Sequence, residues 1–352
     1  HAKECVKLLV DAMRKASNED LASEAAWALN KLLHRCNSAS AWALAAGGLE
    51  AVQRCLTFQN SVEDLQCYAW LARSIGGCRG LLGFLEQAPK FFVARLIWVL
   101  HDERCWRDQH GEEVPEAPEL LKVAAQHLLA ACKSGDEDVI HAGVALLEDM
   151  TSHQHNIAFR LLGDGGGQIF TQILQVFLRG QSERARATAE RCARALGSLA
   201  RVGRANAKEL LVSQGAAEAL KAACMAGGAA GEQSASSLVS LLSLQEVPGL
   251  LGQLTQLEAS QAAAKRLRSA LAAADRAVHE AEDDQVELIP PLMERLLEIQ
   301  MTLEQAGRFG GCQEKCCDAL CSATRRIIWH FQPGQSEVLD KTVGIFVNQM
   351  KQ

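Results

Sequence analysis

Residues 20–56 constrain the fold of this chain most, because they read as three helices separated by two different breaks. Apolar residues recur at helical spacing in the first part, at Ala22, Ala26, Leu29, Leu33 and Cys36. A polar pair at 37–38 interrupts the pattern, and a short apolar piece follows it. Gly47 and Gly48 then turn the chain into a further apolar run at 49–56. The unit is therefore a long helix, a short helix, a glycine corner and another helix.

The same unit recurs twice more along the chain. The second copy spans 136–178 and has a glycine-rich corner at 163–167. The third copy spans 184–225, and its corner lies at Gly215 and Ala216. Glycine supplies the backbone freedom that such a corner requires, and no strand or Gly-Lys-Ser pattern accompanies 163–167 to suggest a phosphate loop.

Weaker patterns fill the intervals between these copies. A degenerate copy occupies 62–85, and apolar helical runs follow at 91–101 and 120–132. The stretch 107–119 holds two prolines and five acidic residues, which predicts an exposed acidic loop. About five or six repeats of roughly 40 residues would cover 1–245.

This unit resembles an armadillo repeat. The matching features are Ala-Ala-Trp-Ala-Leu at 25–29, the Ala-Gly-Gly corner at 46–48 and the stretch 206–216, which runs from an asparagine through an apolar pair to Gly-Ala. The resemblance implies an all-α superhelix whose long helices line a concave groove. Helical pairs of the HEAT type are the alternative.

The pattern changes in the C-terminal region, 246–352. Leucines and alanines recur from 254 to 282 with no glycine or proline between them, which predicts one long amphipathic helix. Pro290 and Pro291 start another helix, and further helices are expected near 313–331 and 337–350. We expect a helical-bundle region here rather than further repeats.

Composition limits the classes of function. The formal net charge is −6, with an isoelectric point near 6.0, so the chain as a whole has no attraction to nucleic acid or to anionic membranes. The best apolar run, 91–100, is interrupted by Arg95 and is too short to cross a bilayer. We therefore expect a cytoplasmic protein, with an organelle or a cilium left open. The sequence begins at His1 rather than Met, inside an apolar helical pattern, which suggests trimming, a missing upstream repeat or a docking end.

The thirteen cysteines are the most prominent candidates for chemistry. Four of them form a tempting metal-binding group, at Cys312, Cys316, Cys317 and Cys321. On a single helix they spread over two edges, so burial on a broad apolar face explains them better than a metal. The pairs His101 with Cys105 and His153 with His155 supply only two ligands each. We expect reduced thiols, no metal and no cofactor.

The armadillo resemblance also implies positions for a partner-binding groove. Armadillo proteins that bind nuclear-import signals carry a Trp and an Asn on their long helices. Here Trp27 is present, but Lys31 takes the Asn position, and the second copy has Val144 and Glu148 instead. A basic import signal is therefore not the expected ligand.

A basic segment at 179–208 suggests a different ligand. This segment contains eight Lys and Arg residues and only two glutamates, which gives a local charge of +6 within an acidic protein. The candidate groove residues are Trp27, Lys31, Glu148, Arg184, Arg191, Arg194 and Arg201. The segment is either a solvated helix face or a docking strip for an acidic segment, from a partner or from the chain's own acidic runs near 112–119 and 280–287. Nucleic acid is not expected, because no aromatic residues alternate with these arginines.

From these observations we predict a non-catalytic protein-binding scaffold or a structural subunit of a larger assembly. The repeat array and the helical tail would provide its binding surfaces. The alternative is a metal-dependent or other catalytic protein that uses the Cys and His groups. No motif for a nucleophile or a zinc protease supports that alternative.

Overall fold

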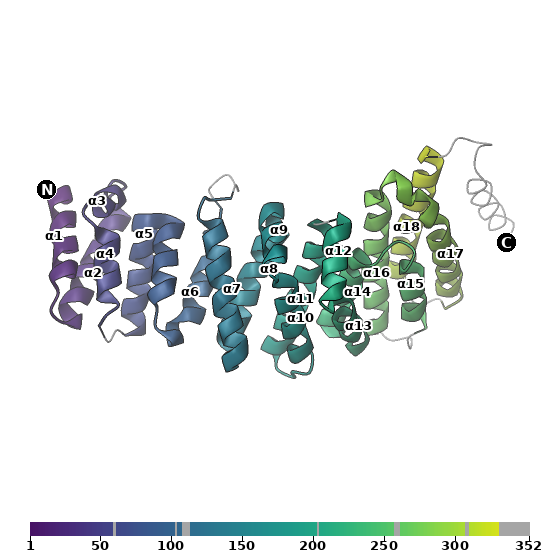
Figure 1. The fold of residues 1–352 in the computed structure, drawn as a ribbon, viewed down its shortest axis with the longest axis horizontal. Coiled ribbons are helices and arrows are strands. Elements are labelled where there is room, and N and C mark those ends of the chain that lie inside the picture. Colours follow the sequence, from purple (N-terminus) through teal and green to yellow (C-terminus); the bar gives the residue numbers. More distant parts are fainter. Residues whose placement is uncertain are drawn as a thin grey trace. The chain divides into compact units, whose positions relative to one another are not determined.

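The computed structural model describes residues 1–58, 61–102, 104–107, 113–202, 204–256, 261–306 and 310–330. Every regular element in these ranges is a helix (Figure 1). The one β-type pairing among them is an isolated bridge between Arg107 and Glu113. The prediction of an all-α protein is confirmed.

The chain forms two compact units, His1–Arg160 and Leu161–Gln352. The helices that begin in the first unit are α1 (Ala2–Lys15), α2 (Glu19–Arg35), α3 (Ala39–Ala45), α4 (Gly48–Cys55), α5 (Val62–Gln87), α6 (Lys90–Asp102), α7 (Ala117–Ser134), α8 (Glu137–His153) and α9 (His155–Gly163). Those of the second unit are α10 (Gly166–Phe177), α11 (Glu183–Val202), α12 (Arg204–Ser213), α13 (Ala216–Ala226), α14 (Gly228–Leu241), α15 (Val247–Thr255), α16 (Gln261–Glu280), the 3₁₀ helix η1 (Asp283–Leu288), α17 (Ile289–Ala306) and α18 (Gly310–His330). The predicted boundary at 245/246 falls inside the second unit and stays a prediction.

The described residues contain the three repeats that the sequence pattern predicts, each with a long helix, a short helix, a glycine corner and a last helix. They are α2–α3–α4, α8–α9–α10 and α11–α12–α13. Each corner holds one glycine in the left-handed region, with φ of 80° at Gly47, 84° at Gly165 and 77° at Gly215. A side chain in this conformation is disfavoured, so glycine sets the direction of the last helix of each unit.

The long helices of these units also begin in the same way. Asn18 accepts a hydrogen bond from the backbone N–H of Leu21 at the start of α2. Asp136 accepts one from Val139 at the start of α8. At α11 the hydroxyl of Ser182 does the same with Ala185, as expected for helix N-caps.

The apolar stripe predicted for the first long helix is buried at Ala22, Ala26 and Leu29 and half-buried at Leu33 and Cys36. Ala193 and Leu196 of α11 take the positions that Ala26 and Leu29 take in α2. Ala26, Leu29 and Ala193 are fully inaccessible and Leu196 is 1% exposed, so equivalent positions of the two long helices are core positions. The small side chains allow close packing: a Cβ on Gly197 of α11 would lie 2.9 Å from the Cβ of Ser237 on α14.

One prediction about the C-terminal region is wrong. The stretch 254–282 is not a single helix, because α15 ends at Thr255 and α16 begins at Gln261, with 257–260 outside the described residues. At this end of α15 the hydroxyl of Thr255 donates to the carbonyl oxygens of Leu251 and Gly252, each at 2.9 Å. The predicted helix after Pro290 is present as α17, and the one at 337–350 lies outside the described residues.

In the second unit, three long helices lie beside one another. α14 packs against both α11 and α16, which brings parts of the repeat array and of the predicted tail onto one face (Figure 1). The buried side chain of Arg266 fixes α16 to the end of α13, with Nη1 donating to the carbonyl oxygen of Cys224 at 2.6 Å. This face positions the site described below.

Candidate functional site

A pocket of about 560 Å³ opens on the face formed by α11, α14 and α16. Its lining residues are Arg194 and Arg201 from α11, Gln233 and Ser236 from α14, and Ser269, Ala272, Arg276 and Glu280 from α16. We call it the basic pocket, because three of these side chains are arginines and one is an acid.

The position of the α11 arginines follows from the burial of the rest of the helix. From Cys192 to Ala200 every residue is buried except Arg194. Arg201 lies seven residues, or about two turns, further along on the same side. Arg194 donates to Oε1 of Glu190 at 2.7 Å, and Arg201 donates to the hydroxyl of Ser198 at 3.1 Å. The structure therefore brings two of the predicted groove residues together.

Electrostatics in the basic pocket are unbalanced. Arg201 is exposed to solvent, but partial burial among neighbouring protein atoms lowers the pKa of its guanidinium. The positive charge of Arg276 lowers the pKa of Arg201 further, while the carboxylate of Glu280 acts in the opposite direction. Two cations that destabilise each other would both be stabilised by an added anion.

Lys208 on α12 belongs to the same electrostatic group. Burial lowers the pKa of its ammonium, and the negative charge of Glu280 opposes this effect. The carboxylate of Glu280 thus acts on both Lys208 and Arg201. This bears on the sequence hypothesis that the chain's own acidic run at 280–287 meets the basic strip, since its first residue lines the basic pocket.

The sequence points to only one pocket residue of α14 and α16, Glu280 in the acidic run 280–287, and misses the others. Arg276 donates from Nη2 to the hydroxyl of Ser236 at 3.2 Å, and Ser269 lies on the same helix as Arg276, two turns earlier. Arg276 is visible in the sequence as one of the basic residues of α16. That Arg276 lies near α11 follows only from the packing of α14 between α11 and α16, which the sequence pattern does not predict.

The remaining predicted arginines lie outside the lining of the basic pocket. Arg184 is exposed near the start of α11, and its carbonyl oxygen accepts from the hydroxyl of Thr188 at 2.9 Å. Arg191 is half-buried in the middle of α11. Both extend the positive charge along this helix without lining the pocket itself.

Trp27 and Lys31, the candidates on α2, belong to the first unit. Trp27 is 42% exposed and Lys31 is exposed. Nearby on α5, Asp64 is a buried carboxylate that accepts from the hydroxyls of Ser23 and Ser61. Burial alone would raise the pKa of Asp64, but these hydrogen bonds, with a smaller contribution from Trp27, hold it below its ordinary value.

Two further tryptophans take the equivalent helix position in the first unit. Trp27, Trp70 and Trp98 are each the ninth residue of α2, α5 and α6 respectively. Trp70 is 41% exposed, with the guanidinium of Arg73 at 5.2 Å from its ring centre. The ring of Trp98 makes edge-to-face contacts with the rings of His101 and His141.

Glu148 does not offer a surface for a partner. Only 5% of it is exposed, within a stretch of α8 that is buried throughout from Ala142. Its carboxylate accepts from the hydroxyl of Ser152 at 3.2 Å. The alignment of repeats placed this position on the groove, but the side chain is held inside the packing of α8.

The cysteines are reduced thiols, and no disulfide joins any of them within the residues that the structure describes. Cys312 and Cys316 are buried and approach the carbonyl oxygens of Ala264 and Leu296, whereas Cys317 and Cys321 are exposed. Burial raises the pKa of Cys316 to about 12. Across the described ranges, no three His, Cys, Asp or Glu side chains come together as a metal site.

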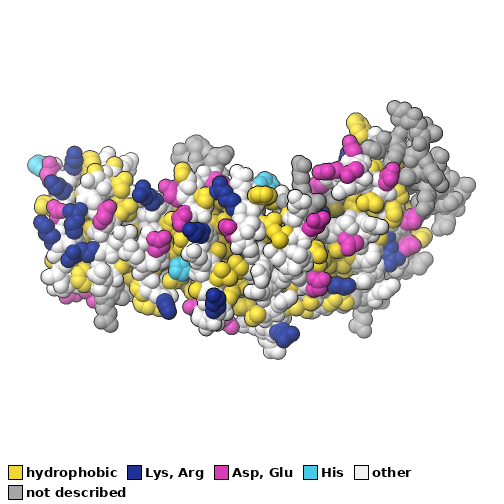
Figure 2. All heavy atoms as spheres, viewed as in Figure 1, with side chains coloured by type: hydrophobic (Ala, Val, Ile, Leu, Met, Phe, Trp, Pro, Cys, Tyr) yellow, Lys and Arg dark blue, Asp and Glu magenta, His cyan; other side chains and the backbone are white. Residues whose placement is uncertain are grey.

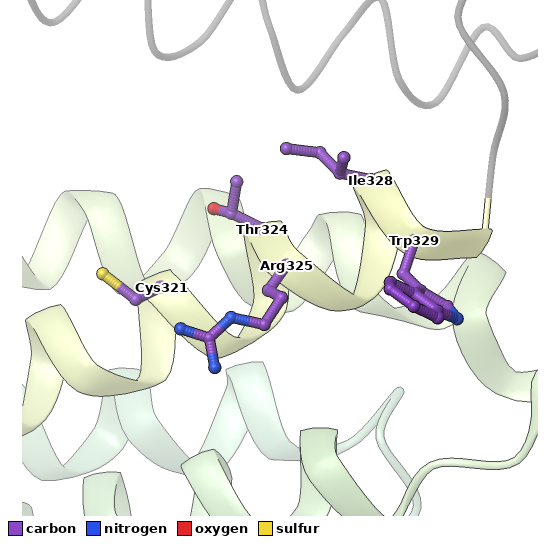
Figure 3. Close-up of a pocket in the computed structure, with 5 residues that line it drawn as sticks. All are labelled: Cys321, Thr324, Arg325, Ile328 and Trp329. Carbon is purple, nitrogen blue, oxygen red and sulfur yellow. The ribbon is translucent and has the colours of Figure 1, made fainter.

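A second pocket involves the last described helix alone. Cys321, Thr324, Arg325, Ile328 and Trp329 line a space of about 720 Å³, and all five belong to α18 (Figure 3). Figure 3 shows Thr324 and Ile328 pointing to one side of the helix and Trp329 to another. Trp329 is 85% exposed. This is an apolar helix surface rather than an enclosed cleft.

Charge on the rest of the surface is mixed. Figure 2 shows one face of the molecule, on which Lys and Arg side chains gather over the first helices and Asp and Glu side chains are spread along the chain. Among the described residues, no helix has the length and apolar character needed to cross a membrane.

Comparisons with known proteins find solved structures of similar fold but no protein related by sequence. No family model matches the sequence, and no curated protein matches it. A crystal structure of an engineered protein from the Northeast Structural Genomics Consortium is 17% identical, covering 97% of this chain and 88% of that chain, with a TM-score of 0.49. A chain from a structure on the phosphorylation switch between cadherin and beta-catenin is 15% identical, covering 99% and 56%, with a TM-score of 0.40.

A designed armadillo repeat protein in complex with the peptide (KR)4 is also similar. It is 15% identical, covers 76% of this chain and 98% of that chain, and has a TM-score of 0.34. All of these scores are low, so the repeat assignment rests on the chain's own three-helix units and their glycine corners. Those units confirm the armadillo-like pattern predicted from the sequence.

Proposed function

We propose that this protein is a non-catalytic scaffold that binds an acidic segment of a partner protein on the face formed by α11, α14 and α16. The observation that carries this proposal is the basic pocket, where Arg194, Arg201 and Arg276 converge with one acid, Glu280. We further propose that the protein acts as a subunit of a larger assembly in the cytoplasm.

The charge contrast supports an acidic ligand. The segment 179–208 has a local charge of +6 in a chain of net charge −6, so positive potential is concentrated where the basic pocket lies. Arginine is suited to this role, because its guanidinium can bind a carboxylate through two parallel hydrogen bonds. Charge complementarity of this kind mainly sets specificity and the rate of association.

The packing of the helices in the second unit supports a scaffold role. The neighbouring long helices α11, α14 and α16 provide a continuous surface, and their buried faces consist mainly of apolar residues, which leaves few polar groups for chemistry. The pocket residues are arginines, serines, a glutamine, an alanine and a glutamate, with no histidine or cysteine among them. This set suits binding of an anion better than nucleophilic or metal chemistry.

Matched charge reversals on α11 test the proposal. Arg201→Glu removes a lining cation of the basic pocket, whereas Arg186→Glu makes the same charge change on an exposed residue of the same helix outside it. Binding of a fluorescein-labelled glutamate-rich peptide is followed by anisotropy at low and moderate salt. We expect Arg201→Glu to lower the affinity at least about tenfold and Arg186→Glu to lower it far less. Equal, small effects would show that α11 presents only a solvated charged face.

A further inference from the structure

We propose that the basic pocket is specific for a phosphorylated side chain, a phosphoserine or phosphothreonine within the acidic partner segment. This inference rests on the proposed function, because it names the group that the same pocket holds most strongly. A phosphate monoester carries about two negative charges at neutral pH and three acceptor oxygens. The basic pocket matches this group in charge, in hydrogen-bond donors and in the grouping of its cations.

The first match is charge. Three arginines and one glutamate line the basic pocket, which leaves a net charge of +2. Two charged neighbours do not change this sum. Glu190, which pairs with Arg194, adds one negative charge, and Lys208, which interacts with Glu280, adds one positive charge. A single carboxylate would neutralise half of this charge, whereas a phosphate dianion would neutralise it fully.

The second match is the set of hydrogen-bond donors. Arg201 lines the pocket from α11 and Arg276 lines it from α16. Partial burial, and then the repulsion from Arg276, lower the pKa of Arg201. The hydroxyls of Ser236 and Ser269 line the same space. Two guanidinium forks and two hydroxyls can saturate the oxygens of a tetrahedral phosphate, while a planar carboxylate has only two oxygens to share among them.

The cations are also grouped in space. Arg194, Arg201 and Arg276 line one open pocket of about 560 Å³. A single group with two negative charges therefore gains more here than a single carboxylate does. Glu280 lies in the lining as an internal anion, so its carboxylate repels the incoming phosphate and sets a limit on the affinity.

The test compares three labelled peptides of otherwise identical glutamate-rich sequence, with phosphoserine, serine or glutamate at the central position. At pH 7.5 we expect the phosphorylated peptide to bind at least about tenfold more tightly than the glutamate peptide. Arg201→Gln and Arg276→Gln should each remove that preference, and the control Arg186→Gln should keep it. Glu280→Gln should raise the affinity for the phosphorylated peptide several-fold, and a gain of this kind cannot come from misfolding.

A pH series adds a second readout. The phosphate loses one negative charge below its second pKa of about 6, so the preference over the glutamate peptide should shrink toward pH 5. His279 is the only histidine on α11, α12, α14 and α16, and its protonation would strengthen anion binding, which is the opposite direction. The charged groups that line the pocket are Arg194, Arg201, Arg276 and Glu280. Their charged neighbours are Glu190, which pairs with Arg194, and Lys208, on which Glu280 acts, while Asp275 pairs with His279. His279→Gln provides the control for this contribution.

The outcomes separate the two proposals. If the glutamate peptide binds through Arg201 but phosphorylation adds no affinity, the phosphate specificity is wrong and the acidic-segment proposal stands. If no peptide binds, both are wrong. Inorganic phosphate should displace the phosphorylated peptide only at high concentration. Tighter binding of single-stranded DNA or of vesicles with phosphoinositide headgroups than of the phosphorylated peptide would overturn the phosphoprotein assignment.

Discussion

Arg276 of α16 donates a hydrogen bond to the hydroxyl of Ser236 on α14, with 3.2 Å between Nη2 and Oγ. This contact joins two of the three helices that form the basic pocket and orients one of its cations. We expect Ser236→Ala to lower the affinity for a glutamate-rich peptide a few-fold and the free energy of unfolding by less than about 1 kcal/mol, since the bond is solvent-exposed. Arg276→Ala should lower the affinity clearly more. An equal loss in both variants would mean that the serine, rather than the arginine, contacts the ligand.

The buried carboxylate of Asp64 should stabilise the first unit in a pH-dependent way. Asp64 is 8% exposed and accepts hydrogen bonds from the hydroxyls of Ser23 and Ser61. Asp64→Asn weakens these bonds, and we expect a loss of about 1–3 kcal/mol in the free energy of unfolding near neutral pH. Denaturant unfolding followed by tryptophan fluorescence measures it.

The sign of the pH effect follows from the lowered pKa of Asp64. Its stabilisation is present above the unfolded-state pKa of about 4 and is lost as the pH falls through the lower folded-state pKa. The stability difference between the wild type and Asp64→Asn should therefore shrink below about pH 4. A difference that stayed constant or grew on acidification would contradict this account.

The glycine corner between α9 and α10 provides a matched set of stability variants. A Cβ on Gly165 meets nothing within 4 Å, so Gly165→Ala should cost only the left-handed backbone conformation, about 1–2 kcal/mol. A Cβ on Gly166 would lie 2.8 Å from both Cδ1 and the carbonyl oxygen of Leu161. Gly166→Ala should therefore cost at least as much, through overpacking of about 1–3 kcal/mol.

The neighbouring Gly163 is the control for this set. Its φ is not positive, and a Cβ added to it would meet no atom within 4 Å, so Gly163→Ala should leave the melting temperature nearly unchanged or raise it slightly. Thermal melts of the three variants measure the order of their melting temperatures. If Gly163→Ala were as destabilising as Gly165→Ala, backbone conformation would not explain the corner.

Thiol reactivity should follow burial. Burial raises the pKa of Cys67 and of Cys316 to about 12, and both side chains are buried, whereas Cys5 and Cys321 are exposed. Because the thiolate is the reactive species, iodoacetamide at pH 7.5 should modify Cys5 and Cys321 first. Mass spectrometry should find Cys67 and Cys316 modified only after unfolding. Early modification of Cys316 would show that its thiol is not buried between α18 and α17, where it donates to the carbonyl oxygen of Leu296.

The sequence predicts the repeat units well because their determinants are local. Helical spacing of small apolar residues and single glycines at corners such as Gly47 and Gly215 specify the unit without reference to distant parts of the chain. The single helix expected at 254–282 is wrong because apolar periodicity alone does not locate a helix end that no glycine or proline marks, such as that of α15 at Thr255.

The basic pocket could be predicted only in part. Arg194 and Arg201 are charged positions at either end of a run of small and apolar residues, 195–200, so the pattern points to an open side of α11. Ser236 and Arg276 belong to later helices, and their contribution depends on α14 packing between α11 and α16. Burial of Glu148 likewise depends on the neighbours of α8, which a repeat alignment does not contain.

Photo-crosslinking tests the central claim most directly, since it places an acidic partner segment on the chain. A glutamate-rich peptide carrying a benzophenone group is bound to the full chain, irradiated, and mapped by mass spectrometry. We predict crosslinks within 233–240 of α14 and 269–280 of α16, and their loss in Arg201→Glu but not in Arg186→Glu. Crosslinks concentrated around Trp27 and Trp70 of the first unit, unchanged in Arg201→Glu, would contradict the account.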